Sequence, residues 1–192
     1  MMEANHLIWT EESRRECFRS GLLSVRDTEC RSPEGKTRIF TVIDCPDWVN
    51  VVPVTENSEG KKFLMVRQWR HGSREMSLEF PGGILEKGEN PETGAARELE
   101  EETAYRAENL IRLGSLRPNP AIMSNTVHFF LAENLIPLAG QNLDEDEFVD
   151  AEFVPEDEVF RNLGDSPYVH SLTAAALALY FKRTIPPISS RA

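Results

Sequence analysis

Short runs of apolar residues divide this chain into strands and helices. Two runs, at residues 22–25 and 38–43, lie on either side of a Ser-Pro-Glu-Gly turn at residues 32–35, which is typical of a β-hairpin. Further runs predict strands at residues 49–54, 63–67, 110–116, 126–132 and 148–154. Helices are predicted from residue 91, over residues 156–163 and over residues 168–183. Strands flanked by a central and a terminal helix predict an α/β fold with three layers.

The helix predicted from Pro91 brings acidic side chains together. Asn90 is a favourable N-cap, and proline suits the first helical position because its missing N–H would have no partner there. Residues three and four apart lie on one face of a helix, so Glu98, Glu101 and Glu102 point the same way. Without compensation, their charges would repel one another.

Carboxylate oxygens are the ligands that Mg²⁺ prefers in phosphate chemistry, so this acidic group suggests a metal site. Acidic runs are also common on solvated helix faces, and the run Arg-Glu-Leu-Glu-Glu-Glu at residues 97–102 does not by itself separate the two interpretations. The preceding loop favours the metal site. Its paired glycines, Gly82 and Gly83, let the backbone approach a bound phosphate or metal without a Cβ in the way.

Residues 83–105 resemble the Nudix box, whose pattern is G-x5-E-x7-R-E-U-x-E-E-x-G-U, with U aliphatic or aromatic. Gly83, Glu89 and the unit from Arg97 to Glu102 match at the required separations. Ala104 replaces the second glycine. A left-handed conformation at that position would cost alanine about 1 kcal/mol, whereas a last helical residue would accept alanine without cost. We expect the second case.

Other segments resemble the branch of Nudix hydrolases that cleaves ADP-ribose and nucleoside diphosphate sugars. These segments are the run Val-Arg-Gln-Trp-Arg-His-Gly at residues 66–72, the loop Glu-Phe-Pro-Gly-Gly at residues 79–83, and Pro120, sixteen residues beyond Ala104. The resemblance covers residues 45 to 183. It implies a Nudix-type α/β/α sandwich with a central mixed β-sheet. It also implies hydrolysis of ADP-ribose to AMP and ribose 5-phosphate, with Mg²⁺, or alternatively Mn²⁺, as the cofactor.

The resemblance assigns roles to residues of the box. The implied metal ligands all have oxygen donors and are Glu98, Glu101, Glu102 and the carbonyl of Gly82. Arg97 would orient the glutamates through charge-assisted hydrogen bonds, and it counts with Glu101 among the catalytic residues. Gly83 and Glu89 would hold the loop against the helix behind the ligands.

A general base is still needed to take a proton from the attacking water. In this branch the base commonly lies on a mobile loop late in the domain, and the acidic segment of residues 143–148 precedes the last predicted strand. The resemblance therefore implies Glu145 as the base and Glu147 as an additional metal ligand. An ordinary solvated acidic turn is the alternative. Nearby carboxylates would raise the pKa of the base and a metal would lower it, so we expect activity to climb into the alkaline range.

Substrate contacts are expected from residues around the box. Arg67 and Arg70 are candidates for the terminal phosphate or the ribose, although strand alternation puts them on opposite faces and only one can easily face the pocket. A surface ion pair is the alternative for Arg67. Glu79 is a candidate for a sugar hydroxyl, and Pro120 for a stiff loop that shapes the pocket. The histidines at positions 71, 128 and 170 are expected to have packing or surface roles.

The charge of the chain limits its partners. Its 192 residues include 21 basic and 32 acidic side chains, a formal net charge of -11, which argues against binding to nucleic acid or to an anionic membrane. A phosphate substrate still fits, because a bound metal ion and a few arginines invert the local field. We expect a cytoplasmic protein with reduced thiols. Its three cysteines are scattered, it has no apolar run of transmembrane length, and its N-terminus does not resemble a secretory signal.

We expect two parts in the chain, an N-terminal β-rich segment at residues 1–45 and a Nudix hydrolase domain at residues 46–192. In the family that the chain resembles, the first part forms a small sheet that completes a homodimer, and the partner subunit contributes to the substrate pocket. Two alternatives remain for the function. The box recognises only metal and pyrophosphate, so another sugar nucleotide such as GDP-mannose, or a dinucleotide, would fit as well. The second alternative is a Nudix module that binds a nucleotide without turnover.

Overall fold

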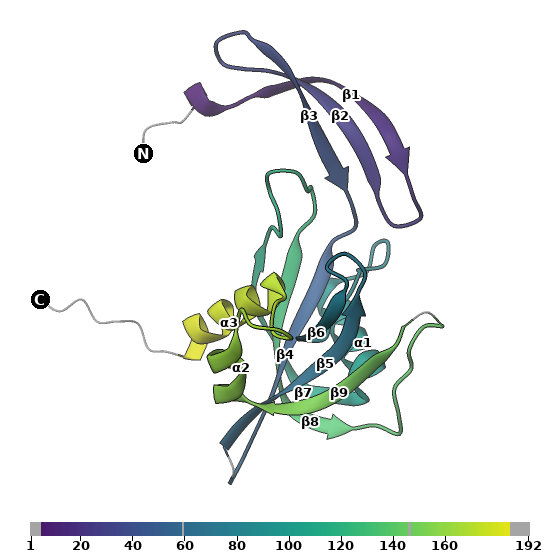
Figure 1. Ribbon diagram of the computed structural model, residues 1–192, viewed down its shortest axis with the longest axis vertical. Coiled ribbons are helices and arrows are strands. Elements are labelled where there is room, and N and C mark those ends of the chain that lie inside the picture. The colour runs from purple at the N-terminus through teal and green to yellow at the C-terminus, as the bar shows by residue number, and fades with distance from the viewer. Residues whose placement is uncertain (1–4, 59, 146, 185–192) are drawn as a thin grey trace, which may run out of the picture. The chain divides into compact units, whose positions relative to one another are not determined.

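The structure, a computed structural model, describes residues 5–58, 60–145 and 147–184, which form two compact units (Figure 1). The first unit comprises Met1–Pro46 and Arg117–Thr126, and the second comprises Asp47–Leu116 and Val127–Ala192. Pro120 therefore belongs to the first unit, where the backbone N–H of Ile43 donates to the carbonyl of Ile122 over 2.7 Å. Within the described ranges, no helix has both the length and the apolar character that a bilayer crossing requires.

A three-stranded antiparallel sheet forms the core of the first unit. Its strands are β1 (Thr10–Arg19), β2 (Ser24–Arg31) and β3 (Thr37–Asp44), adjacent in that order and preceded by the 3-10 turn η1 (Asn5–Leu7). The predicted hairpin is confirmed by β2 and β3, although Leu22 and Leu23 lie in the turn before β2. The sequence does not predict β1, because all ten of its residues are exposed and no apolar alternation marks it.

A mixed six-stranded sheet forms the centre of the second unit. Its strands are β4 (Trp48–Asn57), β5 (Gly60–Arg70), β6 (Glu75–Glu79), β7 (Tyr105–Leu116), β8 (Val127–Pro137) and β9 (Val149–Pro155). The order is β6-β5-β4-β8-β7, with β9 paired to β5. Strands β4 and β8 are parallel and the other pairs are antiparallel, so the predicted mixed sheet is confirmed.

Helices cover both faces of this sheet (Figure 1). Helix α1 (Pro91–Thr103) packs Ala95 and Leu99 on a cluster that includes Val49 and Val51 of β4. Helices α2 (Glu156–Asn162) and α3 (Ser171–Thr184) contribute to a second cluster, which contains Val52 of β4. Because neighbouring side chains of a strand point to opposite faces, β4 serves both cores, and the predicted α/β/α arrangement is confirmed.

Helix α1 begins as predicted and ends differently. The Asn90 side chain accepts a hydrogen bond from the backbone N–H of Glu92 over 2.9 Å, with Pro91 at the start of the helix. At the other end, Ala104 is the C-cap and adopts φ 58° and ψ 31°, which is the left-handed region. The expectation that Ala104 is an ordinary last helical residue is therefore wrong. The chain has to turn sharply there to enter β7, and the carbonyl of Ala104 accepts from Leu138 N–H over 2.7 Å.

Ala104→Gly is expected to raise the free energy of unfolding by about 1 kcal/mol, because glycine adopts the left-handed conformation without a Cβ clash. The control is Ala96→Gly within α1, where glycine is expected to lower the free energy of unfolding by about 1 kcal/mol. Urea unfolding of the three proteins measures both changes. If Ala104→Gly lost as much stability as Ala96→Gly, the left-handed conformation of Ala104 would not be strained.

Candidate active site

The loop before α1 requires glycine at two consecutive positions. A Cβ on Gly82 would lie 2.2 Å from the carbonyl oxygen of Val49, and a Cβ on Gly83 would lie 2.5 Å from Oε1 of Glu98. The same loop is fixed to β4, since the carbonyl of Gly83 accepts from Val49 N–H over 2.9 Å. The paired glycines thus allow the loop to lie between β4 and the acidic face of α1.

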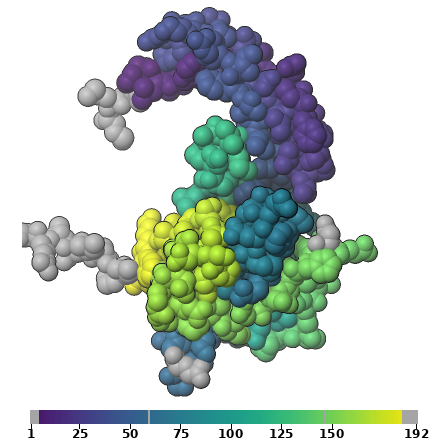
Figure 2. All heavy atoms as spheres, viewed as in Figure 1, coloured from purple at the N-terminus to yellow at the C-terminus, as the bar shows by residue number. Residues whose placement is uncertain are grey.

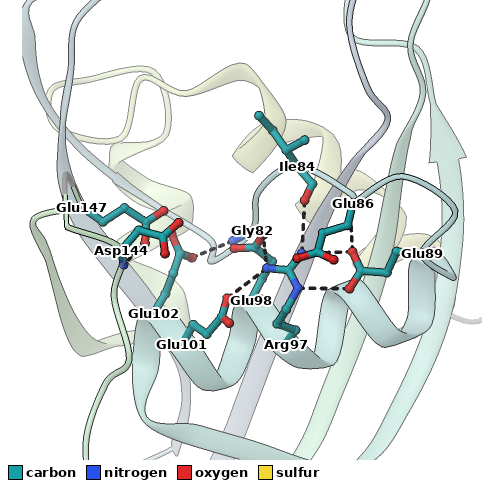
Figure 3. Close-up of polar contacts among 10 residues, drawn as sticks. All are labelled: Gly82, Ile84, Glu86, Glu89, Arg97, Glu98, Glu101, Glu102, Asp144 and Glu147. Atoms are coloured by element: carbon teal, nitrogen blue, oxygen red, sulfur yellow. Dashed lines mark hydrogen bonds and ion pairs between the residues drawn. The ribbon is translucent and has the colours of Figure 1, made fainter. Parts of the chain in front are cut away.

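Arg97 is the centre of the polar network on α1 (Figure 3). Its guanidinium donates to both carboxylate oxygens of Glu89, over 3.0 and 3.1 Å, and to the carbonyl of Ile84 over 3.2 Å. Nη1 donates to Glu98 Oε1 and to Glu101 Oε2, each over 2.9 Å. These hydrogen bonds, first of all the bond with Glu89, hold the pKa of Arg97 above its ordinary value. One cation therefore compensates several of the repelling carboxylates.

Glu89 connects this network to the loop. Its Oε2 also accepts a hydrogen bond from the backbone N–H of Glu86 over 2.9 Å. The hydrogen bond from Arg97 is the main reason why the pKa of Glu89 lies below its ordinary value. Glu89 therefore links Arg97 of the helix to the backbone of the preceding loop.

Glu98 and Glu102 are the buried acids of the site. Glu102 is 4% exposed, and its Oε2 accepts from the backbone N–H of Gly82 over 2.8 Å. Burial is the largest cause that raises the pKa of Glu102 to about 8 and that of Glu98 to about 7, even though Arg97 acts in the opposite direction on Glu98. The charge of Glu147 raises both pKa values further. Two carboxylates are thus held where ionisation without a cation is unfavourable.

This burial predicts a dependence of stability on pH in the absence of metal. Between pH 5 and 8 the folded protein binds protons at Glu98 and Glu102 that the unfolded chain, with ordinary carboxyl pKa values, has lost. The free energy of unfolding therefore receives a contribution from these residues that falls as pH rises. Burial lowers the pKa of His170, so the contribution of His170 to the free energy of unfolding rises with pH. The parent is therefore compared with a variant that keeps His170, in which this contribution cancels.

In EDTA, the free energy of unfolding of the parent is expected to fall relative to that of Glu102→Gln by on the order of 3 kcal/mol from pH 5 to pH 8. Urea unfolding at unit steps of pH provides the measurement. Saturating Mg²⁺ is expected to remove the difference at pH 8, because the cation stabilises the ionised acids. If the free energies of unfolding of the two proteins in EDTA changed equally with pH, the pKa of Glu102 would not be raised in the folded protein.

The loop between β8 and β9 brings further acids to the C-terminal end of α1 (Figure 3). The backbone N–H of Asn142 donates to the carbonyl of Glu101 over 3.1 Å, and the Gln141 amide donates to the carbonyls of Glu102 and Val149. These bonds place Glu147 where its charge acts on Glu98 and Glu102. Glu145 is exposed on the same loop. Sequence reasoning missed Gln141, because nothing local marks an amide that joins a helix end to a strand.

The donor set of the site fits a hard divalent cation. Among the residues that the structure describes, no three His, Cys, Asp or Glu side chains are already arranged as a metal site, and Arg97 and the Gly82 N–H hold the glutamates instead. Glu98 and Glu102 nevertheless offer only oxygen donors, and burial penalises their charge. A cation between them would relieve that penalty, and oxygen donors are the type that Mg²⁺ and Mn²⁺ bind.

A cavity of about 690 Å³ opens beside Gly82 and Gly83. Arg70 lies in its wall and donates from Nε and Nη2 to the two carboxylate oxygens of Glu79, over 2.8 and 2.7 Å. Glu79 is 1% exposed. Arg67, by contrast, donates from Nε to Glu152 Oε1 over 2.9 Å. The structure therefore brings Arg70 and Glu79 to the glycine loop and pairs Arg67 with an acid of β9.

Comparison with known proteins decides the family. The NUDIX domain family matches residues 47–173, which include the glycine loop, α1 and the acidic loop. The chain belongs to the Nudix family. The Nudix box therefore corresponds to the glycine loop and α1, with a left-handed alanine at its second glycine position.

Several relatives of this Nudix chain resemble it over most of its length. The ADP-ribose pyrophosphatase of Bacillus subtilis is 38% identical over 156 residues, which cover 81% of this chain and 82% of that protein. The methanol dehydrogenase activator of Bacillus methanolicus is 35% identical over the same shares. The mouse ADP-sugar pyrophosphatase is 32% identical over 64% of this chain and 59% of that protein. A crystal structure of an ADP compounds hydrolase shares the fold, with a TM-score of 0.79, 24% identity and coverage of 92% and 95%.

Proposed function

We propose that this Nudix protein is a hydrolase that cleaves the pyrophosphate bond of a nucleoside diphosphate linked to a sugar, with ADP-ribose converted to AMP and ribose 5-phosphate. The observation that carries the proposal is the pair of buried acids, Glu98 and Glu102, beside a glycine loop and a cavity that contains Arg70. The names of the Bacillus subtilis and mouse relatives support the substrate class.

Mg²⁺, or alternatively Mn²⁺, would be held by Glu98, Glu102 and the carbonyl of Gly82, with Glu101 and Glu147 as further ligands. When bound, the cation would neutralise phosphate oxygens and lower the pKa of a water molecule. The buried position of Glu98 and Glu102 supports this assignment, because their charge is unfavourable without a cation. Neither acid can be replaced by a neutral residue without removing that driving force.

The other residues of the site orient the acids and accept the proton. Arg97 would hold Glu98 and Glu101 in position, and Glu89 would hold Arg97 against the loop. Glu145 would take the proton of the attacking water as general base, which its exposed position on the acidic loop permits. Arg70, fixed by Glu79, would contact the phosphate of the substrate through the N–H groups that Glu79 leaves free.

We also propose that the protein forms a homodimer through residues 1–45. We propose the cytoplasm as its location. The sheet of the first unit carries exposed large apolar side chains, among them Phe18, Ile39 and Phe40, which a second copy would cover. Among the described residues, Cys17, Cys30 and Cys45 form no disulfide, which suits a reducing compartment. Sedimentation equilibrium tests the dimer: Phe18→Ser with Ile39→Ser is expected to yield a monomer, and a parent that sediments as a monomer would contradict the proposal.

The test of the function is a substrate panel with product identification. The protein is incubated, with Mg²⁺ or with EDTA, with each of four compounds: ADP-ribose, GDP-mannose, flavin adenine dinucleotide and a diadenosine polyphosphate. The products are separated and identified by mass spectrometry. ADP-ribose with Mg²⁺ is expected to yield AMP and ribose 5-phosphate at the highest kcat/KM, and EDTA to abolish turnover. A higher kcat/KM for another compound would make that compound the preferred substrate in place of ADP-ribose. Binding by calorimetry without any product would favour the non-catalytic module.

A further inference from the structure

The acidic loop between β8 and β9, residues 138–148, has little apolar packing of its own. Of its described residues only Leu143 is partly buried, and Phe148 is 84% exposed. In the space-filling view, green residues from this part of the chain stand out from the second unit at its right edge (Figure 2). Apolar burial is the main force that fixes a segment in a folded protein, so the position of this loop depends on its hydrogen bonds.

These hydrogen bonds go to the C-terminal end of α1. The last four carbonyls of an α-helix have no partner within the helix, and in α1 the acidic loop binds two of them. The backbone N–H of Asn142 donates to the carbonyl of Glu101 over 3.1 Å. The side-chain amide of Gln141 donates to the carbonyl of Glu102. The loop is thus bound to the backbone of two residues whose side chains are assigned to the cation.

The Gln141 amide donates to two carbonyls. Besides Glu102, its Nε2 reaches the carbonyl of Val149, the first residue of β9, over 3.2 Å. Both partners are carbonyl oxygens, which only accept, so the nitrogen of the amide and not its oxygen has to face them. One side chain therefore joins the end of α1, the acidic loop and the start of β9.

The charges of the acidic loop oppose this position. The C-terminal end of a helix carries partial negative charge, and Glu145 and Glu147 follow shortly after Gln141. The charge of Glu147 raises the pKa of Glu98 and of Glu102, so these acids repel one another (Figure 3). Without the donors that bind it to α1, the loop would move away from the helix, because a larger separation weakens the repulsion.

We propose that Gln141 is a positioning residue of the reaction: its amide holds the acidic loop against α1, so that Glu145 and Glu147 lie beside the cation. Gln141 acts through these two acids and not by contact with the substrate. The inference rests on the proposed function and deepens it, because it identifies the hydrogen bonds that set the place of the general base. Among the described residues, none that lines the cavity belongs to the acidic loop, so substrate binding does not depend on these bonds.

Gln141→Met removes both N–H groups and keeps the size of the side chain. With saturating Mg²⁺, we expect kcat for ADP-ribose to fall about 10- to 50-fold and KM to stay within about twofold, since a base displaced by about 1 Å loses much of its effect. Gln141→Lys is expected to recover most of kcat, because its ammonium group donates to carbonyls at the negative end of the helix. Gln141→Glu has the same shape but no donor when ionised, and is expected to lose at least as much as Gln141→Met.

The matched control is Asn162→Leu at the end of α2. The Asn162 amide also donates to a helix carbonyl, that of Glu158 over 3.0 Å, but it lies outside the acidic loop and does not line the cavity. Asn162→Leu is expected to lower the urea midpoint as Gln141→Met does, and to leave kcat and KM within about twofold of the parent values. An equal loss of kcat in both variants would overturn the positioning role, because it would reflect stability alone.

A second measurement needs neither the cation nor turnover. Hydrogen exchange of the Asn142 amide, followed by NMR in EDTA, reports whether the acidic loop stays on α1, because this N–H is bonded to Glu101. We expect its protection factor to fall at least about fivefold in Gln141→Met and to be unchanged in Asn162→Leu. Equal protection in the parent and Gln141→Met would refute the inference, as would an unchanged kcat. If the parent hydrolyses none of the four compounds while protection falls as expected, the attachment of the loop stands and only the proposed reaction fails.

Discussion

Glu102→Gln is expected to lower kcat/KM for ADP-ribose about 10³-fold at pH 8 with saturating Mg²⁺. The reason is that a neutral amide has no charge to offer the cation, and the loss of a metal ligand removes several kcal/mol of transition-state stabilisation. The amide oxygen can still accept the hydrogen bond from Gly82 N–H, so the loop keeps its position. Steady-state kinetics with product identification measures the loss, and circular dichroism checks the fold.

The matched control for this prediction is Glu100→Gln. Glu100 lies on the same helix, but it is exposed and its side chain is directed away from the buried acids. Its replacement removes one negative charge from α1, as Glu102→Gln does, and is expected to change kcat/KM less than twofold. Full activity of folded Glu102→Gln would mean that the assigned acids do not act in the reaction.

Arg97→Met is expected to reduce both stability and activity. The variant leaves Glu89, Glu98 and Glu101 without the guanidinium that compensates their charges, while the methionine keeps much of the apolar volume. Because the Arg97 side chain is 26% exposed, solvent screens part of the effect, and we expect the free energy of unfolding in EDTA at pH 8 to fall by about 2 kcal/mol. Activity is expected to fall about 10²-fold, since the acids lose their orientation.

Mg²⁺ separates the two roles of Arg97. Saturating Mg²⁺ is expected to restore part of the stability of Arg97→Met, because a cation between the acids replaces some of the lost positive charge. The control is Arg106→Met on the exposed surface of β7, for which no loss of stability is expected. Urea unfolding with and without Mg²⁺ distinguishes the cases. If Arg97→Met is as stable as Arg106→Met in EDTA, Arg97 does not compensate the acids.

The central sheet and α1 could be predicted from the sequence because their signals are local. The cap Asn90, Pro91 and the apolar stripe of α1 follow one another closely in the sequence, and β4 and β8 are rich in apolar residues. Strand β1 is polar and fully exposed, and β6 has only five residues, so neither carries the pattern of a half-buried strand. The sequence favours a helical Ala104, since a last helical residue accepts alanine without cost, but the turn into β7 determines its left-handed conformation.

The box residues of the site could also be predicted, since their spacing along one helix sets their distances. Contacts made by residues far apart in sequence could not. His170 lies against Glu79 only because the segment before α3 joins the edge of β6, and Gln141 reaches Glu102 only because the acidic loop returns to the end of α1. In the β5–β6 register Arg70 lies opposite Glu75 and Glu79 lies opposite Val66, so the pairing of Arg70 with Glu79 does not follow from facing strand positions either. Such contacts depend on the tertiary fold and have no local signature.

The most direct test of this account is the position of manganese in crystals of the protein, located by its anomalous scattering. We predict one or more peaks between Glu98 and Glu102 at about 2.2 Å from their carboxylate oxygens, and no such peak in crystals of Glu102→Gln. Full occupancy of Mn²⁺ elsewhere, with Glu98 and Glu102 still held only by Arg97 and the Gly82 N–H, would contradict the account.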